Sequence, residues 1–271
     1  MPITFHLKRQ PTVPLEAEVL SPDAVGELSN AEIRALTVYH GKRQLPLGEF
    51  FDVDGERSTD LVLRGDLSKV RWIGRAMTKG TIAVHGSVGM HLGAYMSGGK
   101  IEVHGDAGDW VGAEMKNGAI RVHGNAGGQV GAAYRGSMAG MKNGTILIDG
   151  SAGLEVGMRM RRGLIVVGGP ARDFTGLQMK GGTILLLSGA EIRTGAWMVR
   201  GTIISLKPLA LMPTFVHNCT LTPPFVSVYA KHLKHFNVAL PYAADEGVYE
   251  MHAGDLSVSD KGEILVWRPA C

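Results

Sequence analysis

The chain has 271 residues, of which 45% are hydrophobic and 20% are charged, and its net charge is +3. This length and composition predict a folded protein with a sizeable core, in one large domain or two small ones, and exclude a disordered chain. The small net charge does not indicate a nucleic acid partner.

Neither a membrane segment nor a disulfide framework is expected. No uncharged apolar run reaches the ~18 residues of a transmembrane helix, and residues 1–20 lack the basic-then-apolar order of a secretory signal. The chain has two cysteines, Cys219 and Cys271, which argues against a disulfide framework or a zinc cluster. We therefore expect a cytoplasmic protein.

Residues 1–58 are expected to form a capping and interaction segment in front of the repeats described next. They contain the run ITFHLK and the run RQLPLGEFFDV. A helix is predicted at about 29–38, because Ser29 and Glu32 have the spacing of a capping box.

Residues 59–206 are expected to form a repeat domain with a period of 19 residues. Units such as TIAVHGSVGMHLGAYMSGG (81–99) and KIEVHGDAGDWVGAEMKNG (100–118) align without gaps, and unit 119–144 has seven extra residues near YRGSMAG. One column of the alignment is glycine: Gly74, Gly93, Gly112, Gly131, Gly157, Gly176 and Gly195. A second column is methionine: Met77, Met96, Met115, Met141, Met160, Met179 and Met198. A fixed short period predicts a solenoid.

The fold class follows from the pattern inside each unit. A unit opens with an alternating run such as Ile101-Glu102-Val103-His104, which predicts a strand, and closes with a turn sequence such as KNG. Because 19 residues can bend into one coil, we expect an all-β fold. The expected architecture is a right-handed parallel β-helix of about seven 19-residue coils, with small α/β flanking segments.

Two columns of each predicted strand are expected to face the core. The first is Ile82, Ile101, Ile120, Ile146, Ile165, Ile184 and Ile203. The second is Val84, Val103, Val122, Ile148, Val167 and Leu186. We expect the methionine column to fill a corner of the core, since thioethers strung along the stack do not converge on one metal ion.

Three histidines at one position of consecutive units, His85, His104 and His123, invite a zinc interpretation. A ladder of three rungs spans about 10 Å, whereas the ligands of one zinc ion lie about 2 Å from it. We therefore expect a stacked surface ladder.

No catalytic group is predicted. The stretch GDAGDWVG lacks the spacing of a dinucleotide or phosphate loop, no helix follows it, and it recurs in every unit. The chain also has no nucleophile elbow and no His-Glu-x-x-His motif. We expect no catalytic residue, no metal site and no cofactor of its own.

A basic column follows the methionine column and is the candidate binding site. Its four cations occupy consecutive units: Lys116, Lys142, Arg161 and Lys180. Like charges about 5 Å apart repel one another, so such a column costs stability unless solvent screens it or an anion meets it. Two interpretations remain open at this point, a solvated turn and a binding surface for a polyanion or an acidic partner.

The outward column of the strands changes from polar to apolar along the stack. Its members are Ala83, Glu102, Arg121, Leu147, Val166, Leu185 and Ile204. The apolar half should be covered by the tail of this chain or by another protein. The C-terminal segment, 207–271, contains a predicted short helix in TPPFVSVYAKHLKHFNV and a predicted hairpin in MHAGDLSVSDKGEILVW. We expect His232 and His235 on that helix to be surface or packing residues.

The tandem G-x-x-G-x-x-x-G units resemble the C-terminal domain of the large subunit of glutamate synthase. The repeats together with the tail PLALMPTFVHNCTLTPPFVSVYAKHL resemble the C subunit of formylmethanofuran dehydrogenase. The version in the formyltransferase/hydrolase complex of aerobic methylotrophic bacteria is the most similar, and the likeness covers nearly the whole chain.

This resemblance implies a non-catalytic scaffold subunit in one-carbon oxidation. In the family, a formyltransferase subunit moves the formyl group from formyl-tetrahydromethanopterin to a methanofuran-type carrier such as methylofuran. An amidohydrolase-like subunit with zinc or a similar metal then releases formate, and the methanogen dehydrogenases add molybdenum or tungsten on another subunit. The polyglutamate tail of the carrier is a ligand that the basic column would suit, as would an acidic subunit. The C subunit of a methanogen dehydrogenase is the alternative.

Overall fold

The computed structural model describes residues 1–268, apart from the side chain of Tyr242, so Cys271 lies outside the described residues. Its three α-helices are α1 (Pro22–Val25), α2 (Asn30–Ala35) and α3 (Phe225–Lys234), and its two 3-10 helices are η1 (Leu47–Glu49) and η2 (Pro241–Glu246). None of the helices in this part of the chain has the length and apolar character needed to cross a membrane.

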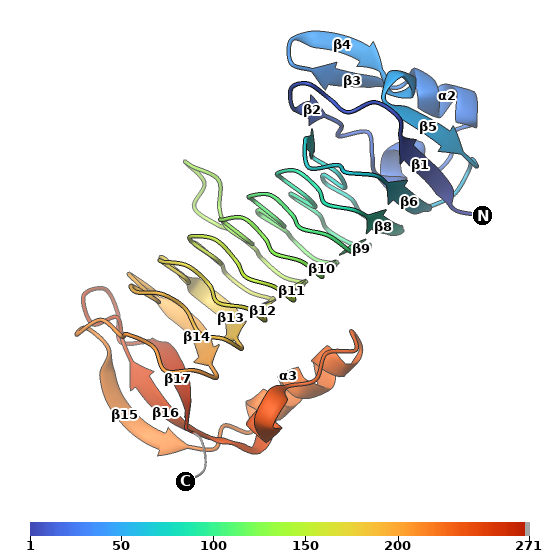
Figure 1. Cartoon of the computed structure of the whole chain (residues 1–271). Helices are drawn as coiled ribbons and strands as arrows, with labels where there is room; N and C mark the ends of the chain where they lie inside the picture. Colours follow the sequence, from blue (N-terminus) through green and yellow to red (C-terminus); the bar gives the residue numbers. More distant parts are fainter. Residues whose placement is uncertain (269–271) are drawn as a thin grey trace.

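Most strands belong to one 13-stranded sheet that runs the length of the molecule (Figure 1). Its central strands are parallel and come from the repeats: β6 (Asp60–Arg64), β8 (Thr81–His85), β9 (Lys100–Val103), β10 (Ala119–Val122), β11 (Thr145–Ile148), β12 (Leu164–Val167), β13 (Lys180–Leu186) and β14 (Arg200–Ser205). Strands from the flanking segments extend it: β1 (Ile3–Leu7), β5 (Phe51–Asp54), β15 (Val216–Leu221), β16 (Val248–Ala253) and β17 (Gly262–Arg268). A second sheet joins β2 (Leu15–Glu16), β3 (Thr37–His40), β4 (Arg43–Pro46) and β7 (Val70–Arg71).

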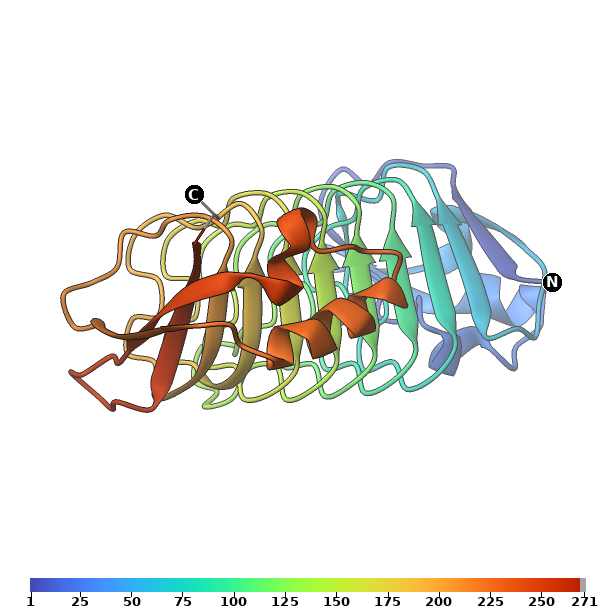
Figure 2. The same cartoon turned by 90° about the horizontal axis from the view of Figure 1, so that it is seen from below.

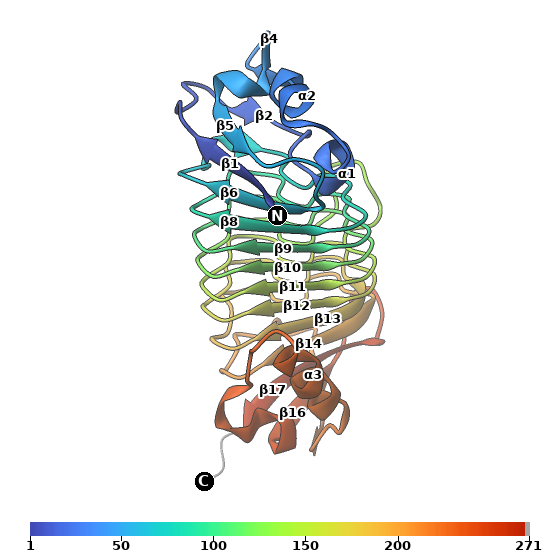
Figure 3. The ribbon, with the colours of Figure 1, turned by 90° about the vertical axis from the view of Figure 1, so that its right-hand side faces the viewer.

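The repeat strands pair in register, so equivalent residues of successive units lie side by side. Ile101 pairs with Ile82 on one side and with Ile120 on the other, and Val103 pairs with Val84 and Val122. Both predicted inward columns are confirmed, since every member has an exposed fraction of 1% or less. Figure 3 shows the strands stacked one above another between the two flanking segments.

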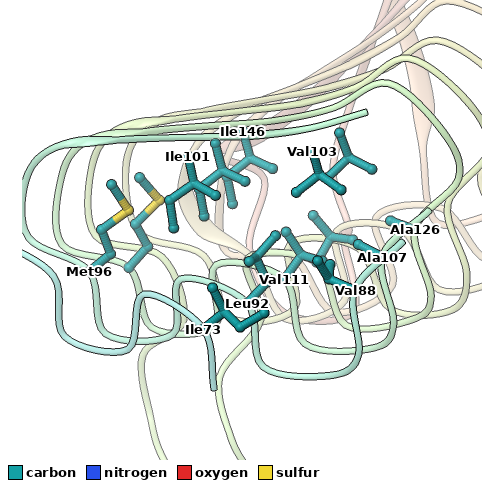
Figure 4. Packing of buried hydrophobic residues seen from close by; sticks show 14 of the residues in the cluster. Ile73, Val88, Leu92, Met96, Ile101, Val103, Ala107, Val111, Ala126 and Ile146 are labelled. Atoms are coloured by element: carbon teal, nitrogen blue, oxygen red, sulfur yellow. The ribbon is translucent and has the colours of Figure 1, made fainter. Parts of the chain in front are cut away.

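The methionine column is also confirmed as part of the core. All seven side chains, from Met77 to Met198, are fully buried. Figure 4 shows Met96 beside Ile101 and Ile146 in the core, with Val111 and Leu92 on the opposite wall.

The rest of each repeat returns to the next strand through turns. In unit 100–118, Trp110, Gly112 and Glu114 have positive φ angles of 67°, 60° and 52°. The N–H groups of Trp110 and Glu114 donate to the next repeat, and that of Gly112 donates to the carbonyl of Leu92 in the previous one. This alternation satisfies the backbone of a wall that contains no strand. A Cβ on Gly112 would lie 2.5 Å from Cδ1 of Ile146, which explains the glycine column.

The expected fold class is wrong. Instead of an all-β, right-handed parallel β-helix of about seven coils, residues 1–268 form a 13-stranded mixed and mostly parallel sheet, a four-stranded sheet and several helices. The sequence pattern marks one strand per unit, and the remaining residues form turns that single β-bridges connect, such as Ala107 to Ala126. A parallel-rich sheet that carries antiparallel strands and helices is an arrangement of the α/β type.

The C-terminal segment covers the apolar half of the outward column, as one of the two predicted alternatives required. Leu147, Val166, Leu185 and Ile204 are buried in a second core cluster. Val226 and Leu233 of α3, together with Tyr249 of β16, belong to the same cluster. Figure 2 shows α3 lying across the strands in the middle of the stack.

The local predictions in the flanking segments are largely confirmed. The capping box forms, since the Glu32 carboxylate accepts from the backbone N–H of Ser29 at 2.8 Å. The helix is shorter than predicted and ends at Ala35, because strand β3 begins at Thr37. Helix α3 begins directly after Pro224, and β16 and β17 pair as an antiparallel hairpin.

Replacing Gly112 with alanine should destabilise the protein more than the same change at Gly136. Both glycines have positive φ, which costs an alanine about 1–2 kcal/mol. A Cβ at Gly136 meets nothing within 4 Å, whereas at Gly112 the clash with Ile146 adds a further cost of about 1–3 kcal/mol. Urea unfolding of both variants measures the difference, and equal losses would show that the contact with Ile146 does not restrict this position.

Candidate functional site

The predicted basic column lies at the turn that follows each buried methionine. The side chains of Lys116, Lys142 and Arg161 are exposed, and Lys180 is half-buried at the start of β13. The backbone N–H of each residue donates to a methionine carbonyl of the previous repeat, at 2.7–2.8 Å. The parallel register therefore sets the spacing of the cations at about 4.8 Å per repeat.

These four cations are not neutralised within the described part of the chain. The ion pairs formed there involve other residues, such as Arg121 with Asp149 and Lys100 with Glu102. Arg162 and Arg200, one position further along, are also exposed. The side chains thus form a strip of like charge on the surface, which solvent ions or an acidic partner can screen.

A groove of about 600 Å³ lies beside the basic column, between the turns and α3. Three side chains at one repeat position, Asn117, Asn143 and Arg162, line its first wall, and Val228, Tyr229, His232 and Phe236 line the second. Sequence reasoning did not anticipate this groove, since it depends on where the C-terminal segment packs. The repeat position of Arg162 was visible in the alignment, but its neighbour across the groove was not.

The histidine ladder forms as a surface stack. The rings of His85 and His104 are parallel with centroids 4.8 Å apart, and those of His104 and His123 are 5.1 Å apart. Within residues 1–268, no group of three or more His, Cys, Asp or Glu side chains has an arrangement that could hold a metal ion.

The last histidine of the ladder connects three repeats. His123 lies 2.9 Å from the carboxylate of Glu102 and 2.8 Å from that of Asp149, and Arg121 pairs with Asp149 at 3.0 Å. The hydrogen bond from His123, followed by that from Lys100, lowers the pKa of Glu102 to about 2. Arg121 also donates to the carbonyl oxygen of Phe236, so this network fixes the chain just after α3.

The two histidines of α3 have packing contacts, as predicted. Nε2 of His232 lies 2.9 Å from the hydroxyl of Thr145, and its ring packs against Phe236. The ring of His235 contacts the backbone carbonyls of the last helical turn.

An aromatic cluster on the opposite wall was not predicted. The rings of Trp72 and His91 stack with centroids 4.1 Å apart, and Trp110 stacks on Tyr134 at 4.7 Å. Tyr134 belongs to the seven-residue insertion, and its hydroxyl lies 2.8 Å from Nδ1 of His91. Aromatic residues at one position of consecutive units were the available signal, but only the folded insertion brings Tyr134 onto them. Burial lowers the pKa of His91 to about 4.

Comparisons with known proteins give a consistent family. The model of the GXGXG motif family matches residues 53–222. A chain in the crystal structure of the formyltransferase/hydrolase complex (FhcABCD) from Methylorubrum extorquens in complex with methylofuran is 34% identical, with a TM-score of 0.90. That match covers 99% of this chain and 100% of the other.

Curated relatives match over shorter stretches. The C subunit of the molybdenum-containing formylmethanofuran dehydrogenase 1 of Methanothermobacter thermautotrophicus is 45% identical over 83 residues, which are 30% of this chain and 21% of that protein. The C subunit of the tungsten-containing formylmethanofuran dehydrogenase 2 of Methanothermobacter wolfeii is 40% identical over 92 residues, which are 32% of this chain and 34% of that protein. The chain thus spans about a fifth to a third of the length of these relatives.

The stability of the chain should fall as the pH is lowered from about 6.5 to about 4, because of His91. The unfolded histidine binds a proton below about 6.5, whereas the folded one stays neutral until about 4, so protons favour the unfolded state in this window. His91→Phe keeps a ring on Trp72 and removes this contribution. Urea midpoints of the wild type and H91F should run parallel above pH 7 and diverge below 6.5. Parallel curves down to pH 4 would contradict the assignment.

Proposed function

We propose that this chain, which belongs to the GXGXG motif family together with the C subunits of the formylmethanofuran dehydrogenases and of the formyltransferase/hydrolase complex, is the non-catalytic scaffold subunit of a formyltransferase/hydrolase complex. The observation that carries this proposal is the end-to-end match, with 34% identity and a TM-score of 0.90, to a chain of such a complex.

The proposed complex moves a formyl group from formyl-tetrahydromethanopterin to a methylofuran-type carrier and releases formate. In this proposal the formyltransferase and amidohydrolase-like subunits perform the reactions, and zinc or a similar metal is bound on another subunit. Support comes from the related complex, whose structure was determined with methylofuran. We also propose a cytoplasmic location and three parts, a capping segment 1–58, a repeat domain 59–206 and a C-terminal segment 207–271.

The second candidate function is that of the C subunit in a molybdenum or tungsten formylmethanofuran dehydrogenase. The curated relatives with these metals in their names favour it. Their likeness extends over about a third of this chain, whereas the likeness to the formyltransferase/hydrolase chain extends over 99% of it, so the hydrolase complex is the better supported of the two.

The basic column would serve this function as a contact surface. Lys116, Lys142, Arg161 and Lys180 have no acidic partner among the described residues, and their spacing suits a row of carboxylates. The proposed ligand is either the acidic tail of the formyl carrier or an acidic surface of another subunit.

Co-purification of the tagged chain tests the scaffold proposal. The chain should be recovered with larger subunits, and formyl transfer and hydrolysis should be found in the assembly and not in the isolated chain. Molybdenum or tungsten in the assembly would favour the dehydrogenase, and zinc alone would favour the hydrolase. Turnover of a formyl carrier by the isolated chain would refute the scaffold function.

Reversing two charges of the basic column should weaken its contacts. In Lys116→Glu/Lys142→Glu, the affinity for the other subunits or for a carboxylate-rich peptide should fall about tenfold at low ionic strength, since an exposed ion pair contributes up to about 1 kcal/mol. The salt dependence of binding should also become weaker. Titrations at two salt concentrations measure both effects.

The matched control is Lys42→Glu/Arg43→Glu. It makes the same change in net charge at exposed residues near β4, in the N-terminal segment. Unchanged affinity and salt dependence in the column variant, or an equal loss in the control, would remove the basic column as a binding surface.

A further inference from the structure

The groove between α3 and the turns has the features of a built binding site. Its wall on the α3 side is held in place by two hydrogen bonds to the sheet, from Thr145 to His232 at 2.9 Å and from Thr183 to Tyr229 at 2.7 Å. The chain after the helix is fixed by Arg121, which donates to the carbonyl of Phe236. The groove is therefore preformed, and its volume of about 600 Å³ is typical of sites for small ligands.

The groove carries hydrogen-bond donors that have no partner in the protein. Asn117, Asn143 and Arg162 occupy the same position of three consecutive repeats, and all three are exposed. Within residues 1–268, none of their side chains has a hydrogen bond or ion pair. The described residues that line the groove include no aspartate or glutamate. An anionic ligand would thus find a guanidinium and two amides, with no repelling charge on the walls.

The rest of the lining is apolar and limits the shape of the ligand. Leu164 is 4% exposed at the base, and Val228, 62% exposed, stands on the α3 wall with Tyr229 and Phe236 beside it. The lining residues of the turn wall come from four repeats, from Asn117 to Gly182, so the groove extends about 14 Å along the stack. A single small anion would contact one rung and leave the others unoccupied.

From these features we propose that the groove binds an extended chain of amide-linked carboxylates, and that Arg162 holds one carboxylate while Asn117 and Asn143 bind amide groups of the chain. The guanidinium of Arg162 suits a carboxylate because it can donate two parallel hydrogen bonds. The methylene and backbone portions of the ligand lie on Val228, Tyr229 and Phe236. The adjacent cations, Lys116 and Lys142, attract the chain from outside the groove. This inference rests on the proposed role of the basic column and gives it a defined binding site.

Binding of a fluorescent penta-glutamate peptide to the full-length chain tests the proposal, with anisotropy as the readout and penta-glutamine as the uncharged reference. Arg162→Ala should lower the affinity about tenfold or more, the effect expected when a charged hydrogen-bonding partner is lost. Arg172→Ala, which removes an exposed arginine from another wall, should leave the affinity unchanged. Val228→Trp should also lower it, since the larger side chain fills the groove without changing any charge.

The outcomes separate the groove from the basic column. If Arg162→Ala and Val228→Trp bind the peptide as the wild type does while Lys116→Glu/Lys142→Glu binds it weakly, the groove is excluded and the column remains. Absence of binding by the wild type, or equal binding of penta-glutamine, also overturns the proposal.

The assembled complex distinguishes the two sources of carboxylates. With Arg162→Ala, a complex that assembles but loses its acidic carrier identifies the ligand as the carrier chain. A complex that fails to assemble identifies the ligand as an acidic segment of another subunit. A complex that assembles and keeps its carrier would contradict a role of the groove in either contact.

Discussion

The in-register pairing of the parallel repeat strands is the constraint on which the rest of this structure depends. A single strand of four or five residues cannot bury its own inward face, so each repeat needs the equivalent side chains of its neighbours. Because inward and outward residues alternate, a slip of one residue between repeats would exchange the buried isoleucine column with the outward column. The glycine corners and the buried methionines repeat with the same translation, as do the stacked histidines.

The same translation brings like charges together. Pairing that places Ile101 on Ile120 also places Lys116 one rung from Lys142, and the repulsion between them is accepted because both side chains reach solvent. The histidine ladder is different, since His123 contacts the carboxylates of Glu102 and Asp149 in the two neighbouring repeats. Stacked positions in a repeat protein are thus either balanced across repeats or left open to a partner, and the basic column is of the second kind.

The outward column decides where the chain can bind something else. Its apolar half, beginning at Leu147, draws α3 onto the sheet, whereas its polar half at Glu102 and Arg121 remains uncovered. Helix α3 therefore ends beside the middle of the stack, where Arg121 fixes the chain that follows it, and the groove forms along its edge. A rigid surface with charged and grooved contacts, and with no group suited to catalysis predicted in it, fits a subunit that positions others.

The sequence by itself determined the 19-residue period, the strand positions, the buried columns and the stacked surface columns, because a fixed translation turns each repeat position into a ladder. It also indicated the capping box at Ser29, the helix after Pro224 and the C-terminal hairpin, since these depend on neighbouring residues. Only the tertiary structure decided the fold class, the groove at Arg162 and the contact of Tyr134 with His91. These features join residues that are far apart in sequence or outside the repeat, so no periodic pattern records them.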